Sequence, residues 1–354
     1  MVGRSGRSLE FVGSYILPGR VLDARVGLEQ ARAAEDLGLG TVWVSERWDT
    51  KELGAVCGAL TQATSRARIA TGVSHFGTRH PIVVAGWALT MQVLSGGRFV
   101  LGFGRSRGPR WEALGIPVPT GRIIADHVAI LRRLWDGETV TYDGPAGRYP
   151  AMRLDDVPDV APPPLLLAAL GPRTLELAGR SFDGVVLHGV LTPEAVARSS
   201  GAVRAAAEAA GRDPGAVKIF ATVITAPDGK DADVRDIVGA RAITYLRHPG
   251  YGQSLAKVNG WDVSVIDRLQ ARVAALSSSH DPADQAIPRS THAEISGLLP
   301  TGWLLDASAV GSARECASRW HDFLDARADE LVIHGATAEM LGPTSQAFVE
   351  LARP

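Results

Sequence analysis

The chain has 354 residues, of which 45% are hydrophobic and 21% are charged, and this ordinary globular composition excludes a disordered or collagen-like protein. The length fits two domains or one large barrel. The formal net charge is −1, so the chain as a whole has no electrostatic attraction to nucleic acid or to an anionic membrane. Its two cysteines are too few for a disulfide framework.

No apolar run of signal-peptide length follows the N-terminal residues. The longest uncharged apolar stretch, 162–171, contains prolines and has the length of a strand. We therefore expect a soluble, cytoplasmic protein that does not span a membrane.

Short apolar runs alternate with longer amphipathic segments along most of the chain. The runs are nearly continuous in apolar residues, which is typical of parallel strands covered on both faces. The predicted strands are 9–17, 41–46, 68–73, 98–104, 163–170, 183–189, 217–225 and 330–335. The predicted helices between and after them are 24–37, 53–64, 81–94, 122–135, 172–180, 192–210, 312–326 and 344–352.

Two segments depart from this alternation. Residues 139–154 alternate in polarity around an Asp-Gly pair, which predicts a β-hairpin. Residues 228–304 are too long for a βα loop and are predicted to be an insertion with helices at 232–245 and 263–276.

Eight β-α units with one insertion predict a single (β/α)8 TIM barrel domain over residues 1–354. An open doubly wound sheet is the main alternative, but no GxGxxG motif follows the first predicted strand.

The active site of such a barrel lies at the carboxyl ends of its strands, and this rule selects three segments. The second strand ends in Ser-Glu-Arg-Trp, which places a carboxylate, a guanidinium and an indole together. The fourth ends in the glycine-rich, basic sequence LGFGRSRG. The fifth strand continues through AALGPRT into a helix, and the free N–H groups at the start of a helix favour an anion such as phosphate. The alternative interpretation of this glycine is a tight turn between strand and helix.

Histidines also lie near these strand ends. His75 and His188 are the best candidates for proton transfer, although a lone histidine is more often a hydrogen-bonded structural residue. No HxxxH or CxxC spacing is present, and neither GxSxG nor a P-loop occurs, so a metal site or a serine nucleophile is not expected.

Several segments together resemble the luciferase-like monooxygenase superfamily, and more narrowly its coenzyme F420-dependent oxidoreductase branch from actinobacteria. They include LGLGTVWVSERWDTKE, RIATGVSHFGTRHP, LSGGRFVLGFGRS and PPLLLAALGPRTLELAGRSFDGVVLHG. The resemblance implies a (β/α)8 barrel that transfers a hydride between F420 and a small organic substrate. It also implies a non-prolyl cis peptide within 71–73. The cofactor-binding residues that it implies are Trp48, Thr71, Gly72, Val73, Gly104, Arg105, Ser106, Ala168, Ala169, Leu170, Gly171, Arg173 and Thr174.

The chain departs from the family where many F420-dependent members carry an Asp-His pair. Glu46 and Arg47 stand there instead, and arginine does not exchange protons near neutral pH. Glu46 remains a candidate acid, Arg47 a candidate for stabilising an anion, and His188 a third catalytic candidate. The five arginines predicted at strand ends form a cationic rim for a phosphate-bearing cofactor: Arg47, Arg79, Arg105, Arg107 and Arg173.

Two other functions stay open. An FMN-dependent monooxygenase uses the same scaffold, and a non-catalytic luciferase-like subunit fits the missing Asp-His pair. The family also implies a homodimer formed through the early helices. Trp87 and Met91 are candidates for its interface, and packing against the barrel is the alternative for both.

Overall fold

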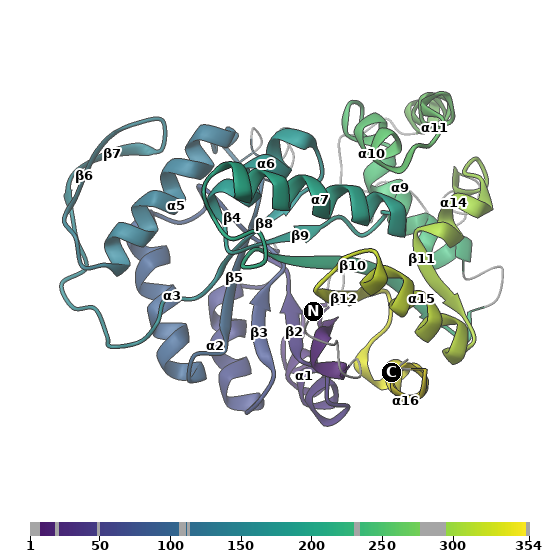
Figure 1. Cartoon of the computed structure of the whole chain (residues 1–354), viewed down its shortest axis with the longest axis horizontal. Helices are drawn as coiled ribbons and strands as arrows, with labels where there is room; N and C mark the ends of the chain where they lie inside the picture. The colour runs from purple at the N-terminus through teal and green to yellow at the C-terminus, as the bar shows by residue number, and fades with distance from the viewer. Residues whose placement is uncertain are drawn as a thin grey trace. The chain divides into compact units, whose positions relative to one another are not determined.

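The computed structural model describes residues 8–17, 21–47, 50–105, 111, 114–229, 234–276 and 295–351. Its barrel strands are β1 (Val12–Tyr15), β2 (Thr41–Val44), β3 (Arg68–Thr71), β5 (Phe99–Gly104), β8 (Leu165–Ala169), β9 (Gly184–Leu187), β10 (Lys218–Pro227) and β12 (Glu330–His334). These strands form a closed parallel sheet in the order β12–β1–β2–β3–β5–β8–β9–β10, with β10 paired back to β12. Figure 1 shows their arrangement. The predicted (β/α)8 barrel is confirmed, and the open sheet is wrong.

The helices that follow these strands begin and end close to the predicted positions. They are α1 (Arg25–Asp36), α2 (Leu53–Ala63), α3 (Pro81–Ser95), α5 (Gly121–Trp135), α6 (Pro172–Ser181), α7 (Pro193–Ala209), α15 (Ala313–Asp325) and α16 (Gly342–Glu350). Local chemistry fixes these limits. Pro81 starts α3, and Gly96 ends it in the left-handed conformation with a φ of 63°. Ser312 and Glu315 form a capping box at the start of α15.

Three short elements were not predicted. Residues Leu9–Phe11 form a 3-10 helix, η1, so the first strand is shorter than expected. The two-residue strand β4 (Ser74–His75) pairs with β5 after β3 has ended. A second 3-10 helix, η3 (Ala338–Leu341), precedes α16.

The predicted hairpin is confirmed as β6 (Val140–Gly144) and β7 (Gly147–Met152). Gly144 pairs with Gly147, so the turn residues are Pro145 and Ala146, and the Asp-Gly pair lies at the end of the first strand. Gly147 has a φ of 134°, which a residue with a side chain rarely adopts.

The inserted region is mainly helical in its described part. It contains the π-helical turn η2 (Val234–Gly239), followed by α9 (Ala240–Leu246), α10 (Tyr251–Asn259), α11 (Val263–Leu276) and α14 (Thr301–Asp306). Helix α11 matches its predicted limits, whereas the helix predicted at 232–245 is divided between η2 and α9. The unpredicted strand β11 (Ser308–Gly311) pairs with β10.

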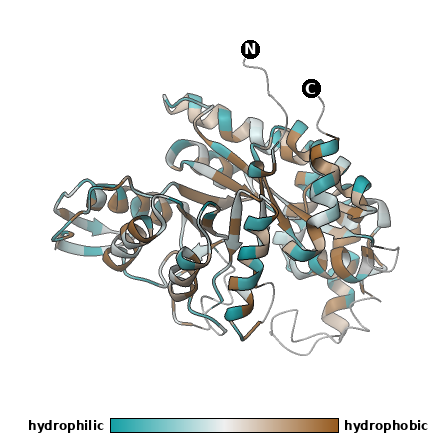
Figure 2. Ribbon diagram, turned by 90° about the horizontal axis from the view of Figure 1, so that it is seen from below, coloured by the Kyte–Doolittle hydropathy of each residue, from teal (hydrophilic) through white to brown (hydrophobic). Residues whose placement is uncertain are grey.

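The described elements divide into two compact units. The N-terminal unit comprises Gly13–Val186 and Ala202–Lys218, and the C-terminal unit comprises Met1–Val12, Leu187–Gly201 and Ile219–Pro354. In the N-terminal unit, Trp43, Phe99 and Phe103 are among the largest fully buried side chains. In the C-terminal unit, Trp320 is fully buried and donates its indole N–H to the Thr225 hydroxyl at 3.0 Å. Hydrophobic colour marks the strands, while hydrophilic positions lie mainly on helices and loops (Figure 2).

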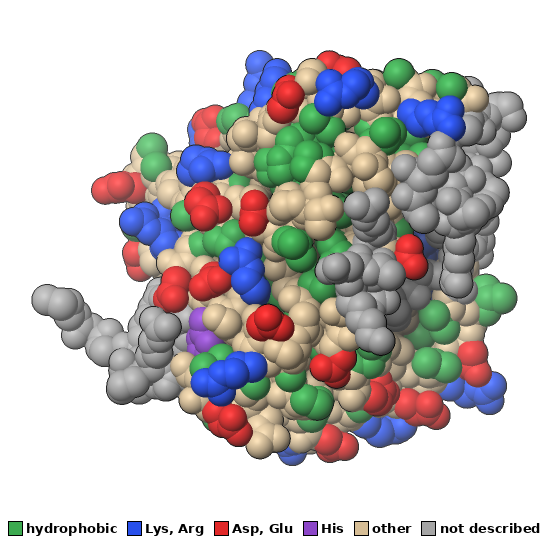
Figure 3. Space-filling view, turned by 90° about the vertical axis from the view of Figure 1, so that its right-hand side faces the viewer, with side chains coloured by type: hydrophobic (Ala, Val, Ile, Leu, Met, Phe, Trp, Pro, Cys, Tyr) green, Lys and Arg blue, Asp and Glu red, His purple; other side chains and the backbone are tan. Residues whose placement is uncertain are grey.

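The surface carries both signs of charge. On the face drawn in Figure 3, acidic and basic side chains alternate among hydrophobic and uncharged ones, as the net charge of −1 leads one to expect. No helix within the described residues is long and apolar enough to cross a membrane.

Candidate functional site

Most of the predicted site residues belong to the N-terminal unit, at the carboxyl ends of β2, β3, β5 and β8. All predicted site residues between Glu46 and Thr174 that the structure describes lie in this unit. Trp48, Ser106 and Arg107 lie outside the described residues.

The expected non-prolyl cis peptide is present between Gly72 and Val73. Three hydrogen bonds hold this turn. The Tyr15 hydroxyl donates to the Gly72 carbonyl oxygen. The Gly72 N–H donates to the Val44 carbonyl at 2.9 Å, and the Glu46 N–H donates to the Val73 carbonyl at 3.3 Å. The ends of β1, β2 and β3 are therefore fixed to one another at this point.

The neighbouring strand β5 lies close to this turn because it carries glycines. The Thr71 hydroxyl donates to the Gly102 carbonyl and accepts from the Gly102 N–H, each at 2.8 Å, so it is fully engaged with backbone. A Cβ atom on Gly104 would lie 2.5 Å from Val73 Cγ2 and 3.7 Å from Ala168 Cβ. Val73, Gly104 and Ala168 are thus brought together, as the strand-end rule predicted.

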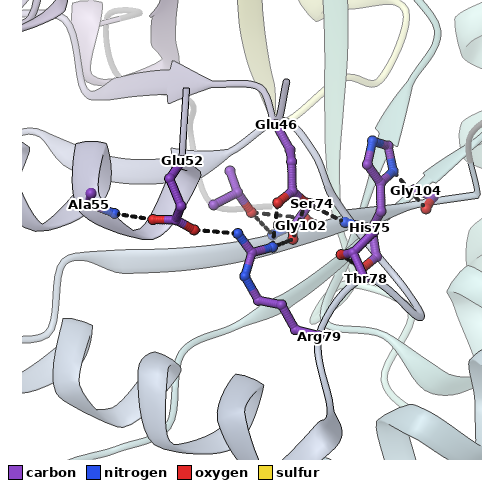
Figure 4. A network of polar contacts seen from close by, with 10 residues as sticks. Glu46, Glu52, Ala55, Ser74, His75, Thr78, Arg79, Gly102 and Gly104 are labelled. Atoms are coloured by element: carbon purple, nitrogen blue, oxygen red, sulfur yellow. Dashed lines mark hydrogen bonds and ion pairs between the residues drawn. The ribbon is translucent and has the colours of Figure 1, made fainter. Parts of the chain in front are cut away.

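Glu46 forms a buried ion pair with Arg79, which follows β4 in the chain (Figure 4). The Glu46 side chain is only 1% exposed. It also accepts hydrogen bonds from the Ser74 hydroxyl at 2.9 Å and from the His75 N–H at 3.1 Å. The other terminal nitrogen of Arg79 lies 2.5 Å from a carboxylate oxygen of Glu52.

This network changes two expectations. Both carboxylate oxygens of Glu46 accept hydrogen bonds from protein donors, an arrangement that favours a positioning role over the predicted role of an acid. Arg79 shares its charge between two carboxylates, and its contribution to the predicted cationic rim is therefore neutralised.

Arg47 and Arg105 lie on either side of this network in the sequence. The Arg47 carbonyl accepts the N–H of Lys51 at 2.9 Å, and the Arg47 side chain is part-exposed. Arg105 is exposed, and its carbonyl accepts the indole N–H of Trp111. The Nδ1 atom of the His75 ring lies 3.4 Å from the Gly104 carbonyl oxygen, and the ring packs edge-on against Trp111.

The AALGPRT segment forms the end of β8 and the first turn of α6. Ala169 and Leu170 are buried, so these positions offer a ligand only their backbone. Gly171 precedes the helix without a side-chain cap, Pro172 occupies the first turn, and no acidic residue follows there. A Cβ atom on Gly171 would meet nothing within 4 Å, and the Arg173 side chain is exposed. These features leave room for an anion at the amino end of α6, where the sequence analysis expects one.

His188 lies in the C-terminal unit, at the carboxyl end of β9. Burial, followed by the positive charge of Arg241, lowers the pKa of His188 from 6.5 to about 3. The lowered pKa favours a neutral imidazole at physiological pH, which argues against the predicted role in proton transfer.

A cleft in the C-terminal unit contains none of the predicted residues. It has a volume of about 480 Å³, and its walls come from the start of α7, the end of α10, α14 and α15. Within the described ranges, no group of three or more histidine, cysteine or acidic side chains is placed to hold a metal ion. Burial raises the pKa of the Cys57 thiol, so this cysteine is not a ready nucleophile.

Two features of the site were not predicted. The hydrogen bond from Tyr15 to Gly72 was signalled only by the position of Tyr15 at a strand end. The pairing of Glu46 with Arg79 joins residues 33 positions apart, and no local spacing in the sequence reveals it.

Comparison with known proteins agrees with this architecture. The family model described as luciferase-like monooxygenase matches residues 12–330. A 5,10-methylenetetrahydromethanopterin reductase from Methanolobus tindarius is 26% identical over 330 residues, covering 91% of this chain and 92% of that protein. An F420-dependent hydroxymycolic acid dehydrogenase from Mycobacterium tuberculosis is 33% identical over 199 residues, covering 52% of this chain and 54% of that protein.

Among solved structures, the coenzyme F420 dependent tetrahydromethanopterin reductase from Methanopyrus kandleri superposes with a TM-score of 0.76. The match covers 97% of this chain and 99% of that chain at 18% sequence identity, which supports the fold.

Proposed function

Because the chain belongs to the luciferase-like monooxygenase family, we propose that this oxidoreductase transfers a hydride between coenzyme F420 and a small organic substrate. Two of the three relatives described above are named for F420, which supports the choice of cofactor. When bound, the deazaflavin exchanges the hydride at its C5 atom, while the protein supplies binding, orientation and electrostatics.

The open amino end of α6 is the observation that carries this proposal. F420 bears a phosphate, and the positive end of the α6 dipole, with the Arg173 N–H in a first turn that has no side-chain cap, attracts an anion. The absence of a side chain at Gly171 leaves room for that group beside the backbone. The exposed guanidinium of Arg173 adds a charged donor. These residues fit a phosphate-bearing cofactor.

We assign the flat ring of the cofactor to the surface formed by Val73, Gly104 and Ala168. A side chain at position 104 would collide with Val73, and its absence keeps this surface flat. Arg47 carries the positive charge that would stabilise a reduced, anionic cofactor, while Glu46 holds the segment that carries Val73. In this proposal, the Asp-His pair that many family members carry at the end of the second strand is replaced by residues that stabilise negative charge on the cofactor.

We also propose that the protein forms a homodimer, with an interface on α3 that differs from the one expected from the sequence. Met91 is 2% exposed and packs inside the unit, so it is not an interface residue. Trp87 contacts the Phe99 ring, with 5.4 Å between the centroids. The apolar side chains that α3 exposes are Val83, Val93 and Leu94, at 55%, 52% and 50%. Equilibrium sedimentation of wild type and Leu94→Glu tests this, and a monomeric wild type contradicts it.

Titration of the protein with F420, followed by fluorescence quenching, tests the cofactor site. Arg173→Gln removes one charged donor and should weaken F420 binding by roughly 5- to 30-fold. Arg180→Gln is the matched control, because Arg180 lies near the other end of α6 and pairs with Glu176. Equal F420 affinity of both variants and wild type would contradict the assignment of the phosphate to α6.

A further inference from the structure

The ring of His188 has a fixed tautomer. The Val190 N–H donates to His188 Nδ1 at 3.3 Å, so the proton of the neutral imidazole resides on Nε2. The lowered pKa of His188 keeps the ring in this form across the physiological range. His188 therefore presents one N–H donor through Nε2.

That donor is buried and has no hydrogen-bond partner in the structure. Buried polar groups in folded proteins are nearly always hydrogen-bonded, so an unpaired one calls for an explanation. Its position at the carboxyl end of β9 gives one, because barrel enzymes bind their substrates at these ends.

Two tyrosines from the inserted region surround the imidazole. The centroid of the Tyr245 ring lies 4.2 Å from that of His188, with 80° between the planes. The Tyr251 ring lies 5.7 Å away at 61°. Tyr245 is on α9 and Tyr251 is on α10, and the Arg241 guanidinium lies 5.1 Å from the Tyr245 ring centroid.

We propose that His188, Tyr245 and Tyr251 form a substrate subsite for an aryl or cyclic ketone, or for the corresponding alcohol. The Nε2–H donates to the oxygen of the substrate, and the two tyrosine rings pack against its flat ring. This inference rests on the proposed function, since hydride transfer commonly interconverts a carbonyl and an alcohol carbon.

The chemistry of the three residues selects this class over others. A neutral donor suits a neutral carbonyl or hydroxyl oxygen, and the nearby Arg241 disfavours a cationic substrate. The tyrosine rings favour a flat apolar body over a sugar or an aliphatic chain. Because Nε2 is covered in this structure, the Tyr245 side chain, which lies nearest, moves as the oxygen enters.

The test uses binding of acetophenone to the full-length protein labelled with 15N-histidine. Acetophenone should shift the Nε2 resonance of His188, whereas ethylbenzene, which lacks the oxygen, should leave it unchanged. His188→Phe keeps a ring but removes the donor, and it should weaken acetophenone binding about tenfold. His188→Gln retains an amide donor and should recover most of the affinity, and Tyr245→Ala should lose it.

The same samples are then titrated with F420, which separates this inference from the proposed function. If the variants bind F420 as tightly as wild type and acetophenone behaves as expected, the results support both the subsite and the proposed function. A wild type that binds acetophenone but not F420 contradicts only the proposed function. No shift with millimolar acetophenone, an equal shift with ethylbenzene, or wild-type affinity in His188→Phe overturns the subsite.

Discussion

The buried ion pair between Glu46 and Arg79 offers the sharpest test of how the strand ends are held together. Replacing Arg79 with methionine preserves most of the side-chain volume and removes the charge. The carboxylate of Glu46, which is 1% exposed, then remains buried without its cation. Removing one partner of a buried pair typically costs about 3–5 kcal/mol.

The lower end of that range applies here. The hydrogen bonds from Ser74 and the His75 N–H remain and stabilise the carboxylate in part. The pair of Arg79 with Glu52 adds little, because the Glu52 side chain is 60% exposed. We expect Arg79→Met to destabilise the protein by about 3 kcal/mol. The double variant Glu46→Gln/Arg79→Met should lose only about 1–2 kcal/mol, since no buried charge is left unpaired.

Urea denaturation at pH 7, followed by circular dichroism, measures these differences from the midpoint and slope of each transition. Arg25→Met is the matched control: its ion pair with Asp23 joins side chains that are 85% and 48% exposed, and its loss should leave the urea midpoint nearly unchanged. A double variant as unstable as the sum of its single variants, or more so, would refute the reasoning.

Three further predictions concern stability. Burial raises the pKa of the Glu35 carboxyl, but hydrogen bonds from the backbone N–H groups of 65–67 outweigh it and lower this pKa from 4.5 to about 2. The ionised carboxylate therefore stabilises the fold by about 1 kcal/mol after allowance for solvent screening, and this stabilisation is present above pH 4.5 and lost as the pH falls toward 2. In urea melts, Glu35→Gln should lack this pH dependence. Gly102→Ala would place a methyl group against a carbonyl of β3 and should cost more than about 2 kcal/mol in the same assay, whereas Gly58→Ala in α2, with nothing within 4 Å, should be neutral or stabilising. Because the pKa of His188 is lowered from 6.5 to about 3, wild type should lose about 1–2 kcal/mol relative to His188→Gln between pH 7 and pH 5, and parallel pH profiles would contradict this.

The barrel was predictable because its signals are local and repeated. Nearly continuous apolar runs separated by amphipathic segments identify each β-α unit without knowledge of its neighbours. The helix beginning at Pro81 and the turn at Gly171 were read from single residues whose backbone preferences are strong. The position of the cis peptide followed from the resemblance in the third-strand motif, and no physical property of those residues alone required it.

The parts that escaped prediction depend on tertiary contacts. Glu46 forms its buried ion pair with Arg79, which reaches it from the loop after β4, and a contact between such distant residues leaves no pattern in the sequence. Strand β11 is too short to show a period, and its pairing with β10 comes from the fold. The inserted helices place Tyr245 beside His188 across 57 residues of sequence, since a ring contact of this kind has no local signature.

Parallel titration of the wild-type protein with F420 and with FMN tests the central claim most directly. The account predicts quenching by F420 at micromolar or lower concentration, with FMN bound at least about tenfold more weakly. Micromolar binding of FMN without binding of F420 would contradict it and identify the flavin-dependent alternative. Failure to bind either cofactor would favour the non-catalytic luciferase-like subunit.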